Sequence, residues 1–324
     1  MKYYKTSFIN AIKDALDSSM SLDDRVILFG LGVGHTSNIY GSTFNLKEKY
    51  GKHRVFDTPS SESALTAMAA GMSLAKLRPV LAHQRFDFML YSMDQIVNWI
   101  SLWSFKSNGK SQMPVVIRAV VGKGWGQGPQ HSKSLHSWFA HLPGISVVYP
   151  SSPYEAKGLY MSAIFANFPV IIFESRSLHV VEQKIPKQNY FLDLQKANIL
   201  KKGKDITLVG FGPSINELIK ISEELGNKNI DAEIVDLRSL NPIDEKTILR
   251  SVNKTRRLFV LEHGLPKMSI SSEIISMVAK KIILKKKPVS LCWPNSLVPT
   301  ATGLEKKFYF TRTQALSKIL KIFK

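Results

Sequence analysis

The stretch DTPSSESALTAMAAGMSLAKLRPVLAH, residues 57–83, contains the two kinds of element that decide the fold. Residues 61–77 predict a helix, because a proline and hydroxyl side chains precede them and small residues dominate them. RPVLAH (78–83) predicts a buried strand, since it is a short and nearly continuous apolar run. A helix that leads directly into a strand is the repeating unit of parallel sheets.

The same alternation continues on both sides of this stretch. Further strands are expected at 25–30, 113–121, 145–150 and 169–175, and further helices at 87–106, which is expected to be long and largely buried, and at 152–165. The strands are continuous apolar runs, as expected when helices cover both faces of a sheet. The alternation therefore predicts an α/β domain with a doubly wound, mostly parallel sheet. The first twenty residues predict an amphipathic surface helix.

A polar stretch with little periodicity, residues 180–205, interrupts this alternation. Strands and helices then alternate again, from ITLVGFG to a last helix in TRTQALSKILKIF. The length of 324 residues is also typical of two domains. We therefore expect a first domain over 1–185, a linker over 186–203 and a second, smaller α/β domain over 204–324.

Cysteine usage and hydropathy indicate the compartment. The single cysteine, Cys292, excludes an internal disulfide and fits a reducing compartment. It lies in the apolar run VSLCWP and is expected to be a core residue. The sequence shows no secretory signal and no apolar run long enough to span a bilayer, so we expect a cytoplasmic protein without a membrane partner.

The formal net charge of +19 is unusually high. Such a charge fits a nucleic-acid partner, but the lysines are spread along the chain, and no zinc-finger spacing or RNA-binding signature accompanies them. We interpret the charge first as solvated surface. A basic docking face and a field that attracts an anionic substrate are the alternatives. No nucleic-acid partner is expected.

Candidate site residues follow the expected strands, where ligands bind in doubly wound sheets. Glu62 follows DTPSS and fits two roles, a first-turn acid that complements the helix dipole or a ligand-binding group. His83, Phe86 and Phe88 follow RPVLA, and for both phenylalanines the residue type alone favours a place in the core. The Gly-rich loop GKGWGQGPQHS then contains His131.

Several chemistries lack their sequence signature. The Gly-rich loop does not have the Walker spacing, and there is no G-x-S-x-G motif. The histidines His83, His131, His136 and His141 follow no zinc spacing and have no cysteine neighbours, so we expect no metal site in this chain. The residues by themselves leave the reaction open.

Several segments together resemble one family. They are DTPSSE, GMSLAKLRPVLAHQRFDFM, MDQIVNW, GPQHS and HLPGISVVYPSSPYEAKGL, followed by LRSLNPID and RLFVLEHGLP in the second domain. This order of motifs is similar to that of the beta chain of 2-oxo acid dehydrogenase first components, such as the pyruvate, branched-chain and acetoin dehydrogenases. These chains belong to the transketolase-like thiamine diphosphate enzymes. The resemblance implies a pyrimidine-binding domain followed by a transketolase C-terminal-like domain.

The resemblance also implies roles for individual residues. Glu62 would face the aminopyrimidine ring of thiamine diphosphate and hydrogen-bond a ring nitrogen, so that the exocyclic amino group can take a proton from the thiazolium carbon. Phe88 would stack on the aminopyrimidine, with Phe86 as its neighbour. His131, in GPQHS, matches the family's active-site histidine and would contact the substrate or transfer a proton. His141 would at most contact residues that themselves contact the substrate.

The sequence departs from the family pattern at several positions. Leu31, in GLGV, stands where these beta chains usually carry an acid. Ala166 and Phe168, in FANFP, replace the acid and the carboxamide of a potassium site found in some members. His83 and Arg85 would give the pocket an unusually polar and basic character. We therefore predict no potassium site and an anionic substrate other than simple pyruvate.

One motif of the family is absent from the 324 residues, the GDG…N motif that binds the diphosphate and Mg²⁺. The resemblance therefore implies a separate alpha-type chain that supplies this half of the site, in an α2β2 assembly with the cofactor at the interface. The chain alone would bind thiamine diphosphate weakly or not at all.

The reaction has more than one interpretation. The first is the beta subunit of an oxidoreductase that decarboxylates a 2-oxo acid and passes the acyl group to a lipoyl-bearing acyltransferase. The second is the C-terminal half of a split transketolase or synthase that acts on ketose substrates. MDQIVNW favours the first, whereas the basic C-terminal helix would repel a basic docking domain. The third is a non-catalytic assembly paralogue, which Leu31 permits. The joint presence of Glu62, Phe88 and His131 disfavours it.

Overall fold

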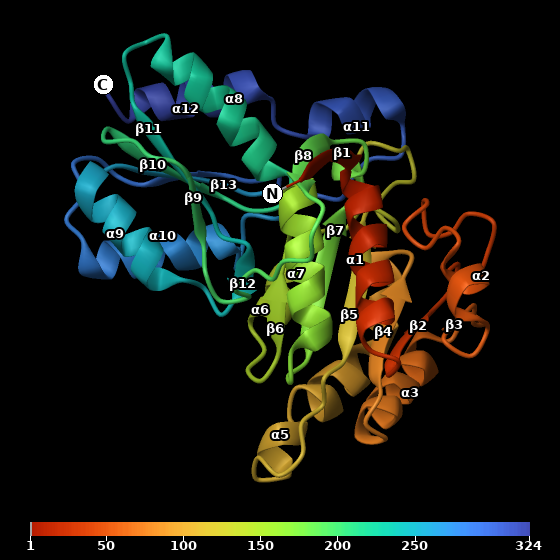
Figure 1. Cartoon of the computed structure of the whole chain (residues 1–324). Helices are drawn as coiled ribbons and strands as arrows, with labels where there is room; N and C mark the ends of the chain where they lie inside the picture. The colour runs from red at the N-terminus through yellow and green to blue at the C-terminus, as the bar shows by residue number, and fades with distance from the viewer. Residues whose placement is uncertain (1) are drawn as a thin grey trace. The chain divides into compact units, whose positions relative to one another are not determined.

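The computed structural model describes residues 2–324, and the chain divides into two compact units. The first unit comprises the chain up to Lys123 together with Trp138–Leu194, and the second comprises Gly124–Ser137 and Gln195–Lys324. Figure 1 shows the elements in chain order, coloured from red to blue. Met1, where the expected N-terminal helix would begin, lies outside the described residues.

The first unit is built on a parallel sheet in which neighbouring strands follow the order β6-β7-β5-β4-β2-β3. These strands are β2 (Val26–Phe29), β3 (Val55–Phe56), β4 (Arg78–His83), β5 (Val116–Val121), β6 (Ser146–Val148) and β7 (Val170–Ser175). Residues on both faces of β5 and β7 are buried, which explains why their sequences do not alternate. The predicted parallel α/β sheet is confirmed.

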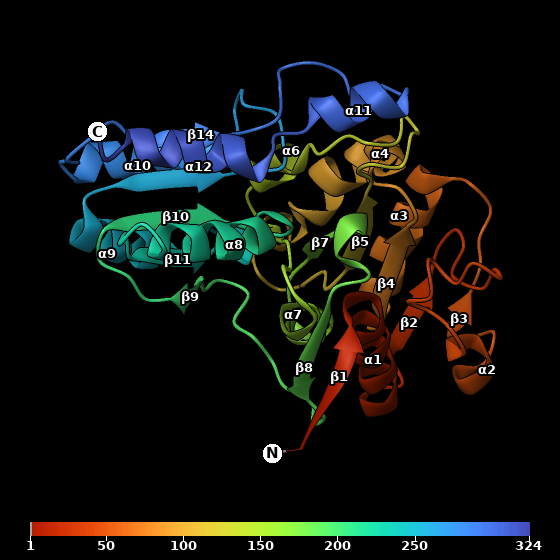
Figure 2. The same ribbon diagram turned by 90° about the horizontal axis from the view of Figure 1, so that it is seen from above.

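Helices cover both faces of this sheet. Helices α1 (Phe8–Leu22) and α7 (Pro153–Phe165) pack side by side on one face, and α3 (Glu62–Leu74) lies on the other (Figure 2). A further helix, α2 (Leu46–Tyr50), precedes β3, and α6 (His136–Ala140) precedes β6. The apolar side of α1 is fully buried, because its apolar residues recur at helical spacing.

The N-terminal prediction is wrong for its first residues. Residues Tyr3–Ser7 form strand β1, which pairs antiparallel with β8 (Glu182–Pro186), and α1 begins only at Phe8. Ser7 ends the strand and caps the helix, since its side chain accepts a hydrogen bond from the backbone N–H of Asn10. The partner strand lies far along the chain, so local periodicity contains no sign of it.

The prediction of one long, largely buried helix at 87–106 is also wrong. The segment consists of short pieces, namely α4 (Phe86–Met89), a 3₁₀ turn (Leu90–Ser92), a π-helix (Gln95–Ile100) and α5 (Trp103–Lys106). The π-helix adds residues to a turn and rotates the side chains that follow. Tyr91, before the π-helix, and Phe105, after it, are 71% and 88% exposed, so the segment is not largely buried.

The second unit contains a sheet with the strand order β14-β13-β10-β11-β9. Its strands are β9 (Asn198–Lys201), β10 (Ile206–Gly210), β11 (Ala232–Asp236), β13 (Leu258–Leu261) and β14 (Val289–Leu291), and β12 (Ser239–Asn241) follows β11 in the chain. Its helices are α8 (Ser214–Gly226), α9 (Glu245–Thr255), α10 (Ile270–Lys281), α11 (Thr302–Phe308) and α12 (Arg312–Lys321). Only β9 runs antiparallel to its neighbour.

Two features of this region were not anticipated. Strands β8 and β9 lie in the polar stretch 180–205, which the sequence analysis treats as irregular. Helix α11 is short and separate from the expected last helix.

Among the described residues, no helix combines the length and the apolar character that crossing a membrane requires.

Candidate active site

Most candidate residues of the first unit gather at the carboxyl edge of its sheet. Strands β4, β2 and β3 are neighbours and run parallel, so the segments that follow them meet at one edge. Leu31 follows β2, Glu62 follows β3, and the segment 83–88 ends β4 and continues into α4. The sheet therefore brings together residues that lie in separate parts of the sequence.

Glu62 is the first residue of helix α3 and is half-buried. Thr66, one turn later, donates its hydroxyl proton to the carbonyl oxygen of Glu62 at 2.8 Å, and its Oγ1 also lies 2.8 Å from the Oγ of Ser92. Among residues 2–324, no side chain or backbone group pairs with the Glu62 carboxylate. The backbone position is thus fixed while the carboxylate remains available to a ligand.

Asp57, in the same DTPSSE motif, links two of the loops at this edge. Its Oδ1 accepts hydrogen bonds from the backbone N–H of Gly32 at 2.8 Å and of Thr58 at 2.9 Å. Gly32 has φ +86°, and a Cβ there would lie 2.8 Å from the Nε2 of Gln84. Sequence reasoning missed this positioning role, although the acid before Thr-Pro was its signal.

His83 and the two phenylalanines lie at different depths. His83 ends β4 and is buried, and burial lowers its pKa to about 4, so the ring is neutral near pH 7. Its Nε2 atom has no hydrogen-bond partner among residues 2–324. Phe86 is fully buried, with edge contacts to Phe139 and Phe173 at centroid distances of 5.9 and 5.3 Å. Phe88 is half-buried on α4.

Two arginines converge on one tyrosine in this unit. The guanidinium of Arg176 lies 3.8 Å from the centroid of the Tyr40 ring, and that of Arg85 lies 5.6 Å from it. Burial lowers the pKa of both arginines, and the charge of Arg176 lowers the pKa of Arg85 further. Arg176 directly follows β7. Sequence reasoning identified Arg85 but missed Tyr40 and Arg176. For Arg176 the available signal was its position directly after the expected strand VIIFES.

A buried ion pair supports the loop that carries Tyr40. Arg118 on β5 and Glu174 on β7 form a two-point contact at 2.7 and 2.9 Å, and both are almost completely buried. Arg118 also donates to the Oγ of Ser42 at 2.9 Å, and the hydroxyl of Tyr160 donates to Glu174. This network holds residues next to Tyr40 against the sheet.

The remaining two candidates, His131 and His141, are carried by other segments of the chain. His131 is half-buried in the second unit, on the Gly-rich loop that belongs to Gly124–Ser137, and its backbone N–H donates to the carbonyl oxygen of Gly128 at 3.3 Å. His141 is exposed in a turn of the first unit. The exposed position of His141 gives no support for a role close to a bound substrate.

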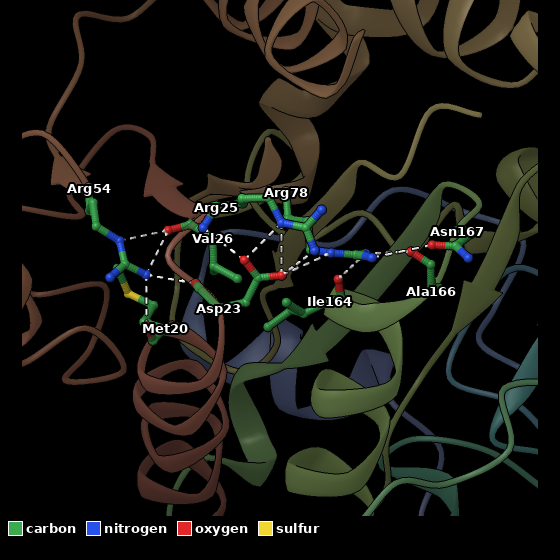
Figure 3. A network of polar contacts seen from close by, with 9 residues as sticks. All are labelled: Met20, Asp23, Arg25, Val26, Arg54, Arg78, Ile164, Ala166 and Asn167. Carbon is green, nitrogen blue, oxygen red and sulfur yellow. Dashed lines mark hydrogen bonds and ion pairs between the residues drawn. The ribbon is translucent and has the colours of Figure 1, made fainter. Parts of the chain in front are cut away.

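The end of helix α7 does not fit a cation site with an acid and a carboxamide. Ala166 and Phe168 supply no ligand oxygen from their side chains. The Nη1 of Arg78 donates instead to the carbonyl oxygens of Ile164 and Ala166, at 3.0 and 2.9 Å (Figure 3). Its Nε also lies 3.4 Å from the carboxylate of Asp23. Within residues 2–324 there is no cluster of three or more His, Cys, Asp or Glu side chains suited to a metal ion.

Comparison with known proteins decides the family. The chain matches the transketolase pyrimidine binding domain over residues 5–180 and the transketolase C-terminal domain over residues 195–314. The chain belongs to the transketolase family. Its resemblance to the beta chains of 2-oxo acid dehydrogenase first components is thereby confirmed as well, since its relatives include such subunits.

Two curated relatives of this transketolase-family chain illustrate the similarity. It is 36% identical, over 99% of its length and 98% of the relative, to the beta subunit of acetoin:2,6-dichlorophenolindophenol oxidoreductase from Cupriavidus necator. It is also 36% identical, over 86% of both chains, to the beta subunit of the pyruvate dehydrogenase E1 component from Bacillus subtilis.

A solved structure shares the fold. It is described as a split gene transketolase in an inactive beta4 tetramer, and the TM-score is 0.81. The likeness covers 98% of this chain and 99% of the other, at 20% sequence identity. At that identity the likeness concerns the fold alone.

Proposed function

We propose that this chain is the beta subunit of a thiamine diphosphate-dependent oxidoreductase that decarboxylates a 2-oxo acid and transfers the acyl group. One observation carries the proposal: the carboxylate of Glu62, at the carboxyl edge of β4, β2 and β3, pairs with no group among the described residues. It occurs in a chain that is similar, over 99% of its length, to the beta subunit of an acetoin oxidoreductase and, over 86%, to the beta subunit of a pyruvate dehydrogenase E1 component.

The residues at this edge fit the aminopyrimidine part of the cofactor. When bound, thiamine diphosphate supplies an electron sink for breaking the bond between the carboxylate and carbonyl carbons of a 2-oxo acid. A Glu62 carboxylate oxygen would share a proton with a nitrogen of the aminopyrimidine ring, and the exposed side of Phe88 would pack on the ring face. Phe86 is fully buried and would contribute to the core beneath this edge of the sheet.

The chain does not fit the diphosphate part. It has no GDG…N motif, and its described residues hold no cluster of metal ligands. We therefore propose that an alpha-type chain supplies the diphosphate and Mg²⁺ site, in an α2β2 assembly. A lipoyl-bearing acyltransferase is the proposed acyl acceptor, and the cytoplasm is the proposed compartment.

His131 is the proposed proton donor or acceptor toward the substrate. An imidazole nitrogen can donate or accept a proton, and the Gly-rich loop holds the side chain half-buried. The neutral, buried ring of His83 would line the pocket without adding a charge.

The substrate proposal rests on Arg85 and Arg176. Two guanidiniums that face the same tyrosine ring create a positive field at the carboxyl edge of the sheet. They favour a 2-oxo acid with an additional anionic or strongly polar group over simple pyruvate. An activity panel in which pyruvate is by far the best substrate would contradict this part of the proposal.

The same arginines favour a second candidate function. A ketose phosphate also presents an anionic group, and the fold is shared with a split gene transketolase. The second candidate is therefore the C-terminal half of a split transketolase or synthase. A non-catalytic assembly paralogue is the remaining alternative.

The deciding experiment is co-expression with an alpha-type chain from the same organism. The purified complex is assayed with thiamine diphosphate, Mg²⁺, a dye acceptor and a panel of 2-oxo acids and ketose phosphates. Dye reduction with a 2-oxo acid supports the first proposal, and ketol transfer without oxidation supports the second. Failure to form a complex and to bind the cofactor supports the paralogue.

A further inference from the structure

A carboxylate from the last part of the chain holds the Gly-rich loop that carries His131. Glu305 lies on α11 and is 2% exposed. Its Oε1 accepts a hydrogen bond from the backbone N–H of Gly124, and its Oε2 accepts one from Gly126, both at 2.9 Å. The hydroxyl of Tyr309 donates to Oε1 at 3.2 Å. One side chain therefore fixes two backbone groups of the loop.

The loop adopts a conformation that few residue types permit. Gly124, Gly126 and Gly128 have φ values of +74°, +70° and +66°. A Cβ on Gly128 would lie 2.2 Å from the Oγ1 of Thr300, so the loop passes directly against the segment before α11. Figure 1 and Figure 2 both show the yellow-green loop beside α11.

A second anchor lies on the other side of His131. The Nε2 of His136 is 2.8 Å from the Oε1 of Glu262, and both side chains are fully buried. The hydroxyl of Ser134 donates to the carbonyl oxygen of His263 at 2.8 Å, and its Oγ lies 3.1 Å from the Nδ1 of His136. The N–H of Ser271 donates to Glu262 at 2.8 Å.

We propose that Glu305 is a positioning residue for His131. Its carboxylate sets the conformation of the loop on one side, while the His136–Glu262 pair holds the other side and leaves His131 between the two anchors. The inference deepens the proposed function and rests on it for the role of His131. Helix α11 would then influence the reaction through the loop that carries His131.

The test uses the complex with the alpha-type chain and the variants Glu305→Gln, Glu305→Asp and Glu273→Gln. Glutamine offers one acceptor atom, and its amide N–H₂ opposes the second backbone donor, so the loop loses a contact. Because small displacements of a catalytic group reduce turnover strongly, we expect Glu305→Gln to lower kcat about 100-fold. The KM for the best substrate stays within about threefold, since substrate binding does not depend on this contact.

Hydrogen exchange supplies the readout that does not depend on activity. The backbone amides of residues 122–132 should exchange faster in Glu305→Gln, while protection in the rest of the chain is retained. Aspartate keeps the charge but is shorter, so Glu305→Asp should give an intermediate kcat and intermediate exchange. Glu273 is exposed on α10, and Glu273→Gln should match the unmodified protein.

The outcomes separate this inference from the proposed function. If the unmodified complex is inactive on every substrate, the proposed function fails, and unchanged loop exchange in Glu305→Gln would overturn the anchor as well. If the complex is active and Glu305→Gln keeps its kcat, the positioning role is overturned even when exchange increases. If Glu305→Gln does not fold, Glu305→Asp decides by the same two measurements.

Discussion

Glu62 begins α3 with its backbone fixed by Thr66 and its carboxylate unpaired among the described residues. An acid at this position also interacts favourably with the helix dipole, which is worth a few tenths of a kcal/mol to about 1 kcal/mol. The two roles differ in what a neutral replacement does. Loss of the dipole interaction affects stability slightly, whereas loss of a proton-transfer partner affects turnover.

We expect Glu62→Gln to lower turnover of the complex by about 100- to 10,000-fold, because glutamine cannot share a proton with a ring nitrogen. Its thermal unfolding should stay close to that of the unmodified protein. Glu48 is an exposed acid in the first turn of α2, and Glu48→Gln is the matched control that should retain full turnover. Near-normal turnover of Glu62→Gln in a steady-state assay would remove Glu62 from the mechanism.

His83 makes stability depend on pH. Its pKa in the folded chain is about 4, below the ordinary 6.5, because burial disfavours the charged ring. The contribution is fully present above pH 6.5 and is lost as the pH falls through 4. A shift of this size corresponds to about 3 kcal/mol.

The free energy of unfolding of the unmodified protein should therefore fall more steeply between pH 6.5 and pH 4 than that of His83→Gln. Denaturant unfolding at several pH values measures the difference. Some pH dependence should remain in the variant, since burial also lowers the pKa of His179 to about 4. Parallel stability curves for the two proteins would contradict the assignment to His83.

At the scale of elements, Arg78 acts as a cap on helix α7. The carbonyl oxygens of Ile164 and Ala166 lie at the negative end of the helix. The positively charged guanidinium of Arg78 donates hydrogen bonds to both of them (Figure 3). Asp23 lies next to the same guanidinium, and its pKa is lowered to about 2, chiefly by hydrogen bonds from Arg25 and less by Arg78. A cationic side chain thus stabilises this helix end through several contacts.

Arg78→Met should reduce the free energy of unfolding by about 2–3 kcal/mol, because two carbonyl groups lose a charged donor. Arg25 pairs with the same aspartate, but its side chain is 56% exposed, so Arg25→Met should cost less than about 1 kcal/mol. Denaturant unfolding of both variants checks the difference. Equal losses would mean that the helix-end contacts contribute little.

The elements also show where local patterns are sufficient. Strands such as β5 and β7 were predictable, because burial on both faces requires continuous apolar runs. The pairing of β1 with β8 was not predictable, because neither segment contains a signal for the other. The breaks in 86–106 were missed because π and 3₁₀ turns share the apolar composition of an α-helix.

At the scale of the whole molecule, the chain contains one half of the proposed active site. The carboxyl edge of the first sheet offers groups for an aminopyrimidine, whereas the described residues offer no metal cluster for a diphosphate. We therefore expect the chain alone to show no turnover and to bind thiamine diphosphate far more weakly than the complex does. Calorimetric titration with and without the alpha-type chain, in the presence of Mg²⁺, measures this difference. Turnover by the isolated chain would contradict it.

The sequence by itself determined the α/β class, the parallel first sheet and the choice of Glu62 and His131 as candidates. These inferences depend on neighbouring residues, because apolar runs and motifs are local signals. Only the tertiary structure decided that Arg85 and Arg176 converge on Tyr40. Only it brought Glu305 to the amides of Gly124 and Gly126, 181 and 179 residues earlier in the chain. Such contacts join side chains and backbone groups of distant segments, and local sequence contains no record of which segments packing will bring together.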